Sequence, residues 1–549
     1  MNTHYTIDVT TTDSSNAIDE VWGSSVEEID ILGHPCSSFV KRRRHLGDLL
    51  LDGRRFGERE YLVHGDRRLS FDAHEAAVKR VAALLQGHGV RAGDRIMLFG
   101  ANSIEWVVSY WAIMELGGIV VLGNAWWSQG EVEHALRTVS PALVITDEPR
   151  TEKIGLTQAK VGFEVIEAAV ADPEPAATYA RPVMQEDDPA VVLFTSGTTG
   201  LPKGAVLSHR GILATLQSLA LLTRRLPESG ADLPRSSKAM LSIPLFHVGG
   251  LQQIITPMLA GGTLVFTEGR FDPATVVRLI EDENITVWST VPTMVSRVMD
   301  HLEEVDHEPL SMLRTVGLGG SPVGMQLRSR VPHWFPNASR GVAVTYGLSE
   351  AGGVLATGVG DELLNRPGTV GKPLKIVTVR IDDPDENGHG EIMVRSPSVM
   401  LRYWSGNGER AANDPITADR WLRTGDVGWL DDDGYLYVTD RSKDIVIRGG
   451  ENIATPHVEN RLLEHPDVRE AAVVGLPHPH LGEEVGAILV LDKGSQVSVD
   501  ELAAFAREKL AYFEVPTRWQ LRQSPLPQNA TGKVVKRVLR DEWAAEIES

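Results

Sequence analysis

Residues 193–204 (LFTSGTTGLPKG) join a short apolar run to a loop of glycine and hydroxyl residues that ends in a lysine. Glycine lets backbone N–H groups approach an anion closely, while hydroxyl groups and a lysine add donors and positive charge. The segment therefore predicts a polyphosphate-binding loop after a buried strand. It is not a loop of the G-x-x-x-x-G-K-[ST] type, because Pro202 stands where that pattern needs its second glycine.

Residues 345–350 (TYGLSE) place an aromatic ring shortly before a carboxylate. An aromatic face suits a purine, and a carboxylate oxygen suits a hard cation such as Mg²⁺. A serine hydrolase is a poor interpretation, since Ala351 replaces the second glycine of G-x-S-x-G. Residues 317–322 (GLGGSP) form a glycine-rich turn, but Pro322 breaks the dinucleotide pattern G-x-G-x-x-G.

Four more segments in the second half of the chain carry charge, glycine or both. Taken alone, residues 440–444 are typical of a charged turn, and residues 529–531 match a glycosylation site that no secretion signal supports. The order of the four segments along the chain, after the two segments above, is what makes them informative. They are residues 423–426 (RTGD), 440–444 (DRSKD), 448–453 (RGGENI) and 527–533 (PQNATGK).

In this order the segments resemble the signature motifs of the adenylate-forming superfamily, which includes acyl-CoA synthetases, peptide adenylation domains and firefly-type luciferases. The matches run from residue 193 to residue 533, and the stretch from about residue 46 also resembles the first subdomain. The chain is identified as a member of the acyl-CoA synthetase branch, which includes fatty-acid–CoA ligases. The resemblance implies ATP, Mg²⁺ and coenzyme A as cofactors and a carboxylic acid as substrate.

The resemblance also implies a set of site residues. Tyr346 is expected against adenine, Asp426 and Arg441 at the ribose, and Lys443 at a hinge. Metal binding is assigned to Thr195 and Glu350, and catalysis to these two together with Lys533 and His247. The other expected binding residues are Ser196, Gly197, Thr198, Thr199, Gly200, Lys203, Gly319, Gly320, Ser321, Pro322, Thr345, Gly347, Gly449 and Gly450.

Two half-reactions follow from the resemblance. A carboxylate attacks the α-phosphorus of ATP, and a thiol then takes the acyl group from the adenylate. The C-terminal domain is expected to rotate between them, so that Lys533 leaves and the loop around Gly449 and Gly450 enters. His247, in residues 244–250 (PLFHVGG), is expected to border the acyl pocket.

Apolar runs of strand length alternate with helix-like stretches, which predicts an α/β fold with mixed and parallel sheets. The expected strands include residues 95–99, 119–122, 143–146, 191–194 and 263–266, and the expected helices 71–86, 273–284 and 498–510. We predict an irregular leader at residues 1–40, a large N-terminal domain at 41–440 and a small, mobile α+β domain at 441–549, with a hinge near 440–445.

The chain has 549 residues and a formal net charge of −20, from 54 Lys plus Arg and 74 Asp plus Glu. Such an acidic chain argues against general nucleic-acid binding. The basic run at residues 41–45 is interpreted as a solvated face, and the lone Cys36 as an incidental thiol. With no signal peptide, no transmembrane segment and one cysteine, we expect a cytoplasmic protein. A homodimer is among the assemblies left open.

The acid itself is less well defined. Small residues near the expected pocket, such as Gly249, Gly250 and Gly353, favour a fatty acid or another bulky apolar acid, and no acidic residue there would receive an amino group. Three alternatives stay open: an enzyme that loads a carrier protein, a luciferase-like oxygenase, and a non-catalytic nucleotide-binding homologue.

Overall fold

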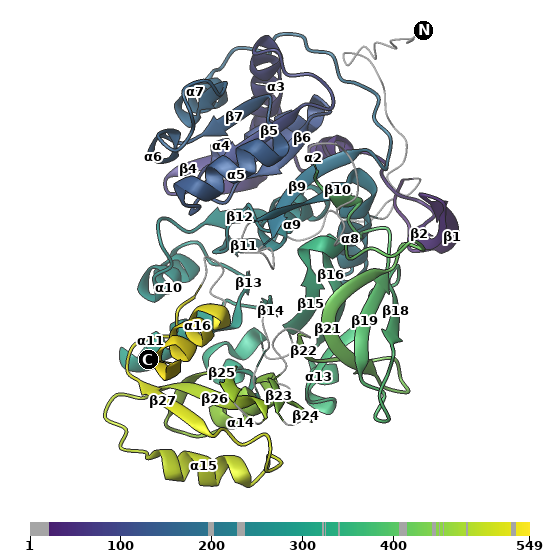
Figure 1. The fold of residues 1–549 in the computed structure, drawn as a ribbon. Coiled ribbons are helices and arrows are strands. Elements are labelled where there is room, and N and C mark those ends of the chain that lie inside the picture. Colours follow the sequence, from purple (N-terminus) through teal and green to yellow (C-terminus); the bar gives the residue numbers. More distant parts are fainter. Residues whose placement is uncertain are drawn as a thin grey trace.

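The computed structural model places a large α/β part and a smaller C-terminal part beside each other, as expected (Figure 1). The upper, purple-to-teal elements lead through green strands to the yellow-green C-terminal elements at the bottom. The structure describes residues 21–195, 202–227, 236–320, 323, 325–338, 341–405, 414–441, 446–448, 451–453, 455–478, 481–528 and 534–548.

The first sheet has seven strands in the described ranges, in the order β20-β10-β9-β6-β5-β7-β8. The strands from β8 to β9 pair in parallel, whereas β10 and β20 are antiparallel. The central strands are buried apolar runs, as a parallel sheet covered by helices requires. The strands are β5 (Arg95–Phe99), β6 (Ile119–Leu122), β7 (Leu143–Thr146), β8 (Lys160–Gly162), β9 (Pro189–Thr195), β10 (Lys203–Ser208) and β20 (Arg402–Tyr403).

Serine caps begin three of the helices beside this sheet. Ser70, Ser103 and Ser128 each accept a hydrogen bond from a backbone N–H of the first helical turn, which satisfies a donor that has no partner within the helix. The helices are α2 (Leu49–Gly53), α3 (Phe71–Gly87), α4 (Ile104–Glu115), α5 (Gln129–Val139), α6 (Glu148–Thr151) and α7 (Phe163–Ala171).

The second sheet has thirteen strands in the described part of the chain, in the order β18-β19-β21-β22-β17-β16-β15-β14-β13-β11-β12-β3-β4. The run from β3 to β15 is parallel, and the strands from β16 to β18 are antiparallel. Its strands are β3 (Glu60–His64), β4 (Arg67–Ser70), β11 (Lys238–Leu241), β12 (Thr263–Phe266), β13 (Val287–Thr290), β14 (Thr315–Gly319), β15 (Val342–Leu348), β16 (Gly353–Val359), β17 (Thr369–Pro373), β18 (Thr378–Asp382), β19 (Gly390–Arg395), β21 (Leu422–Leu430) and β22 (Leu436–Arg441). Helix α8 (His209–Leu222) follows β10 of the first sheet, and the helices that follow strands of the second sheet are α9 (Val248–Ala260), α10 (Pro273–Asp282), α11 (Pro292–Glu304), α12 (Met325–Trp334) and α13 (Asp361–Asn365).

The C-terminal part has its own sheet and its own hydrophobic clusters. The capping box predicted from Ser498 and Glu501 is present at the start of α15. The elements are β23 (Val446–Arg448), β24 (Glu451–Ile453), β25 (Val468–His478), β26 (Gly482–Leu491), β27 (Arg518–Arg522), α14 (Thr455–Leu463), α15 (Val499–Arg507) and α16 (Lys536–Glu548). Within the described ranges, no helix is both long enough and apolar enough to cross a membrane.

Part of the expected irregular leader is ordered. Strands β1 (Val26–Ile31) and β2 (His34–Phe39) pair as a hairpin, and the intervening Leu32 and Gly33 both have positive φ. Leucine is unusual in such a turn, so the local sequence gave little signal for it. Burial raises the pKa of the Cys36 thiol on β2 to about 11, the opposite of what a nucleophilic thiolate needs.

The interpretation of residues 41–45 as a solvated face is wrong for two of the arginines. Arg42 Nε lies 2.9 Å from Glu186 Oε2, and Arg43 Nη2 lies 2.7 Å from Asp52 Oδ1. Both acids come from other parts of the fold and are almost fully buried. Arg42 and Arg43 therefore form ion pairs with buried acids, which sequence spacing alone could not reveal.

Three buried histidines, His45, His74 and His209, have pKa values lowered to about 3, mainly because burial disfavours their charged form. An unfolded histidine titrates near about 6.5. Below that pH these histidines bind protons in the unfolded chain but stay neutral in the folded chain. The free energy of unfolding therefore falls as the pH decreases toward about 3.

His74→Leu should make this loss of stability less steep. His74 is 1% exposed and lies edge-on to Tyr61, so leucine keeps the position apolar while removing the titrating group. We expect the free energy of unfolding of the variant to fall by about 1.4 kcal/mol less per pH unit below about pH 6. Urea unfolding at several pH values measures both slopes. Equal slopes would show that His74 is not held neutral.

Candidate active site

The ends of the expected phosphate loop are fixed by a strand pair. Thr195 is the last residue of β9, Lys203 is the first residue of β10, and the two are cross-strand partners. Adjacent strands lie about 4.8 Å apart, so the hydroxyl-bearing and lysine ends of the loop are held next to each other. The loop residues Ser196, Gly197, Thr198, Thr199 and Gly200 lie outside the described residues.

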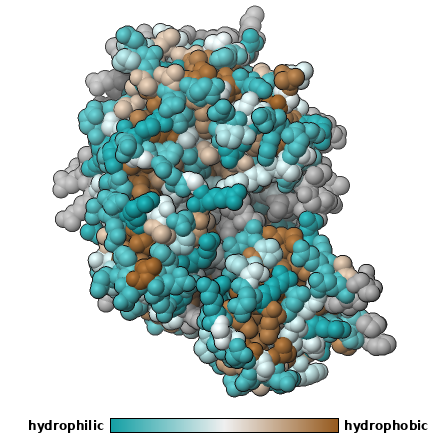
Figure 2. All heavy atoms as spheres, turned by 90° about the vertical axis from the view of Figure 1, so that its left-hand side faces the viewer, coloured by the Kyte–Doolittle hydropathy of each residue, from teal (hydrophilic) through white to brown (hydrophobic). Residues whose placement is uncertain are grey.

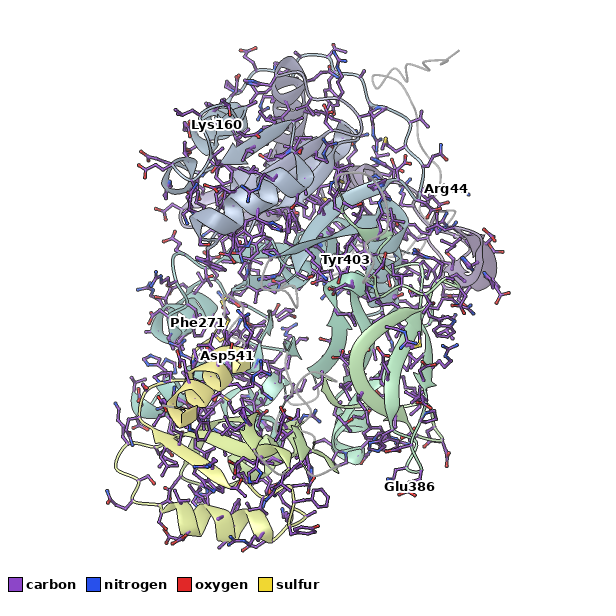
Figure 3. The ribbon with its side chains drawn as sticks, viewed as in Figure 1. Arg44, Lys160, Phe271, Glu386, Tyr403 and Asp541 are labelled. Carbon is purple, nitrogen blue, oxygen red and sulfur yellow. The ribbon has the colours of Figure 1, made fainter. Side chains whose placement is uncertain are left out.

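Tyr403, labelled near the centre of Figure 3, contacts both Lys203 at the end of this loop and the expected metal ligand Glu350, and no local sequence motif marks it. Its phenol donates a hydrogen bond to Glu350 Oε1 over 2.8 Å. Lys203 Nζ lies 5.4 Å from the centre of its ring. Burial and the adjacent Glu350 raise the pKa of Tyr403, so the phenol stays protonated and remains a donor.

Glu350 follows β15 in a short 3₁₀ turn (Ser349–Ala351), and its backbone oxygen accepts a hydrogen bond from Met400 N over 2.8 Å. With Thr195 it supplies the hard oxygen donors that Mg²⁺ prefers. Mg²⁺ is commonly held by one or two carboxylates together with substrate phosphates, so these residues fit a nucleotide-bound ion. Among the described residues, no group of three or more His, Cys, Asp or Glu side chains is placed to hold a metal.

A second tyrosine–carboxylate pair lies on the second sheet, with Tyr346 on β15 and Asp426 on β21. Tyr346 Oη donates to Asp426 Oδ2 over 2.7 Å, and Asp426 is 5% exposed. The Asp426 backbone N–H is in turn bonded to Thr424 Oγ1 over 3.1 Å. Arg441 is the cross-strand partner of Asp426 in β22, although its side chain lies outside the described residues. The structure thus brings the expected adenine and ribose residues together.

Glycines allow the strands to approach each other here. Gly319 pairs with Thr345, and a Cβ on Gly319 would lie 2.4 Å from Thr345 Oγ1. A Cβ on Gly347 would lie 2.0 Å from the Gly353 carbonyl oxygen. Gly320 ends the turn with φ +82°. The neighbouring Ser321 and Pro322 lie outside the described residues.

His247 occupies the position before α9, with its ring 4.5 Å from that of Phe246. One stripe of α9, at the i, i+3, i+4 spacing of a single helix face, lines the cleft beyond it. The stripe consists of Gly249, Gln252, Gln253, Thr256, Pro257 and Ala260. His247 lines the same cleft. In the sequence it comes after the phosphate-loop ends and before the stripe.

The cleft has a volume of about 3800 Å³ and receives residues from both parts of the chain. On the large part it is lined by Thr195, Lys203, Tyr346, Glu350 and Asp426, and on the small part by His457, Gln528, Val534 and Lys536. In the view of Figure 2 the small part lies beside the large part, and hydrophilic side chains predominate on this face.

The remaining expected residues fall between described segments. Gln528 and Val534 form a β-bridge on either side of residues 529–533, and Arg448 pairs with Glu451 on either side of residues 449–450. These pairs mark two separate places on the C-terminal part. The expected site residues Lys443, Gly449, Gly450 and Lys533 lie outside the described residues.

Comparisons with known proteins cover nearly the whole chain. The model of the AMP-binding enzyme family matches residues 52–404, and that of the AMP-binding enzyme C-terminal domain matches residues 457–533. A long-chain-fatty-acid–CoA ligase of Bacillus subtilis is 31% identical over 535 residues, covering 89% of this chain and 92% of the relative. A feruloyl-CoA synthase of an Amycolatopsis species is 34% identical over 487 residues, covering 87% and 94%.

The fold is also that of a solved synthetase. The o-succinylbenzoate CoA synthetase of Bacillus subtilis, in complex with its acyl-adenylate intermediate, aligns with a TM-score of 0.77 and 31% identity, covering 90% of this chain and 98% of that chain. Its structure with ATP and a magnesium ion aligns with a TM-score of 0.76 and 30% identity, over the same shares.

Asp426→Asn should weaken ATP binding. The substitution keeps the size of the side chain but removes the charge expected to accept hydrogen bonds from the nucleotide. Hydrogen bonds to charged groups contribute about 1.5–3 kcal/mol, so we expect a loss of about 10-fold or more in affinity by titration calorimetry.

Asp431→Asn is the matched control for this variant. Asp431 also accepts backbone hydrogen bonds, from Asp433 and Tyr435, but in the turn between β21 and β22. ATP affinity in this control should stay at the wild-type value. Wild-type affinity in Asp426→Asn as well would remove Asp426 from the nucleotide site.

Proposed function

Because the chain belongs to the AMP-binding enzyme family, in its acyl-CoA synthetase branch, we propose that it joins a carboxylic acid to coenzyme A through an acyl-AMP intermediate. One observation carries the proposal. Thr195 and Lys203 pair at the ends of the phosphate loop, and Lys203 lies beside Tyr403, which is hydrogen-bonded to Glu350. These residues line the same cleft as the pair Tyr346 and Asp426. The cleft thus combines groups for phosphate, metal, purine and ribose.

In the first half-reaction a carboxylate oxygen forms a bond to the α-phosphorus of ATP, and the bond to pyrophosphate breaks. Nucleophile and target are both anionic, and two unit charges 4 Å apart repel by about 4 kcal/mol at an effective dielectric of about 20. Lys203, at the end of the phosphate loop, offsets part of this repulsion. Mg²⁺ held by Glu350 and Thr195 would supply further positive charge to the phosphate oxygens.

In the second half-reaction the thiol of coenzyme A attacks the acyl carbon. The carbon–sulfur bond forms, the carbon–oxygen bond to AMP breaks, and the thiol proton passes to solvent. We propose that Lys533 serves the first step and that the loop at Gly449 and Gly450 contacts the acceptor in the second. Their flanking pairs are Gln528 with Val534 and Arg448 with Glu451. Val534 packs against one hydrophobic cluster of the small domain, whereas β23 and β24 contribute to the other, which supports two arrangements of this domain.

A hinge between the domains follows from the same proposal. Strand β22 ends at Arg441 in the large sheet, and β23 begins at Val446 in the small sheet. We place the domain boundary at residues 440–445, with Lys443 as the hinge residue. A few residues between packed elements can absorb the backbone change that a domain rotation needs.

We propose a fatty or aryl acid as the substrate, with His247 at the border between the acyl and thiol routes. Helix α9 carries no acidic side chain along its cleft-lining stripe, which disfavours an amino acid. The two curated relatives named above carry fatty and aromatic acyl names, so they support the class rather than one acid. A cytoplasmic location and a homodimeric assembly stay predictions.

The proposal is tested by mass spectrometry of products from ATP, Mg²⁺, coenzyme A and a panel of fatty and aryl acids, followed by Lys533→Ala on the acid that reacts. The variant should lose acyl-AMP formation by a factor on the order of 10² or more, because a positioned positive charge is removed. Thioester formation from supplied acyl-AMP should stay close to wild type.

Lys509→Ala serves as the control, since Lys509 is an exposed lysine paired with Glu464 on the same domain. An equal fall of both half-reactions in a folded Lys533→Ala protein would contradict the two-arrangement assignment. Acyl-AMP without acyl-CoA from the wild type would move the acceptor to a carrier protein. An oxygen-dependent, light-emitting product would favour the luciferase-like alternative. No product from any acid would favour the non-catalytic homologue.

A further inference from the structure

Backbone hydrogen bonds join the segment that contains Tyr403 to β10 and to Glu350. Leu401 N donates to Val206 O over 2.7 Å, and Trp404 N donates to Gly204 O over 2.6 Å, which fixes the segment against β10. At its other end, Met400 N donates to Glu350 O over 2.8 Å. A few consecutive residues thus connect the strand that follows the phosphate loop to the backbone of the carboxylate residue.

The phenol of Tyr403 completes this connection through side chains. It donates to Glu350 Oε1 over 2.8 Å, and the centre of its ring lies 5.4 Å from Lys203 Nζ, so one side chain contacts the expected metal ligand and lies beside the lysine of the phosphate loop. Tyr403 is itself the cross-strand partner of Ala205, which limits how far the ring can move. The bond to Oε1 therefore restricts rotation of the Glu350 carboxylate.

We propose that Tyr403 is a positioning residue for the magnesium–nucleotide complex: it orients the Glu350 carboxylate and joins it to β10, the strand that follows the phosphate loop. This inference rests on the proposed function, since it assigns a task within the adenylation site. Removing a residue that orients a metal ligand typically lowers metal affinity or activity by about 10–100-fold. Because Tyr403 acts through Glu350, removing its hydroxyl group should lower ATP affinity mainly when Mg²⁺ is present.

Tyr403→Phe removes only the hydroxyl group and tests the proposal. We expect the Mg²⁺ concentration for half-maximal acid-dependent pyrophosphate release to rise by about 10-fold or more. Titration calorimetry gives a readout independent of turnover. ATP affinity should fall in saturating Mg²⁺ and should match wild type in a chelating buffer that removes the metal.

Tyr61→Phe is the matched control. Tyr61 also makes one phenol hydrogen bond, to the Ile254 carbonyl oxygen over 2.7 Å, but in the core of the same domain, and it does not line the cleft. We expect its Mg²⁺ dependence to equal that of the wild type. Comparing the thermal unfolding of the two variants separates a loss of folded protein from a change at the site.

A double-mutant cycle with Glu350→Gln identifies the route of the effect. If Tyr403 acts through Glu350, the two substitutions together should raise the half-saturating Mg²⁺ little more than Glu350→Gln alone. Fully multiplicative effects, an unchanged Mg²⁺ dependence in Tyr403→Phe, or an equal loss of ATP affinity with and without Mg²⁺ would each overturn the proposal. Wild-type pyrophosphate release, measured in parallel, shows separately whether the proposed function holds.

Discussion

The pairing of β10 with β9 on one side and β20 on the other brings the reactive groups of this protein together. It holds Thr195 opposite Lys203 and sets Tyr403 beside both. Strand spacing in a sheet is nearly constant, so the two ends of the phosphate loop cannot separate without breaking backbone hydrogen bonds. The carboxylate of Glu350 reaches the same place through the phenol of Tyr403 and the backbone of Met400. A short antiparallel edge on a parallel sheet thereby organises the site.

The acidic composition of the chain bears on how this junction can hold a polyphosphate. The chain carries a formal net charge of −20, and several of its interior arginines are already neutralised. Arg42 and Arg210 share Glu186, while Arg43 pairs with Asp52. An acidic protein that binds a polyphosphate must concentrate positive charge locally. In the proposed function, Lys203, the metal held at Glu350 and the incoming Lys533 supply that charge, each at a defined step.

Local sequence patterns predicted much of the fold and of the site. The runs at 95–99, 119–122 and 143–146 are the strands β5, β6 and β7, and each contains three or four consecutive apolar residues, as expected of a buried parallel strand. The nucleotide segments were found because each is contiguous. Tyr403 was missed because its role depends on β20 pairing with β10, almost two hundred residues earlier in the chain, which no local pattern of about 10 residues encodes. The ion pair of Arg42 with Glu186 was missed for the same reason.

In the proposed mechanism, a carboxylate attacks the α-phosphorus of a nucleotide held at this junction. The most direct test uses an acid from the reactive panel with oxygen-18 in both carboxylate positions, incubated with the wild-type enzyme, ATP, Mg²⁺ and coenzyme A. Carboxylate attack on the phosphorus predicts AMP that carries one labelled oxygen. The acid oxygen joins the phosphorus in the first step and stays there when the acyl carbon–oxygen bond breaks. Unlabelled AMP formed together with acyl-CoA would contradict it.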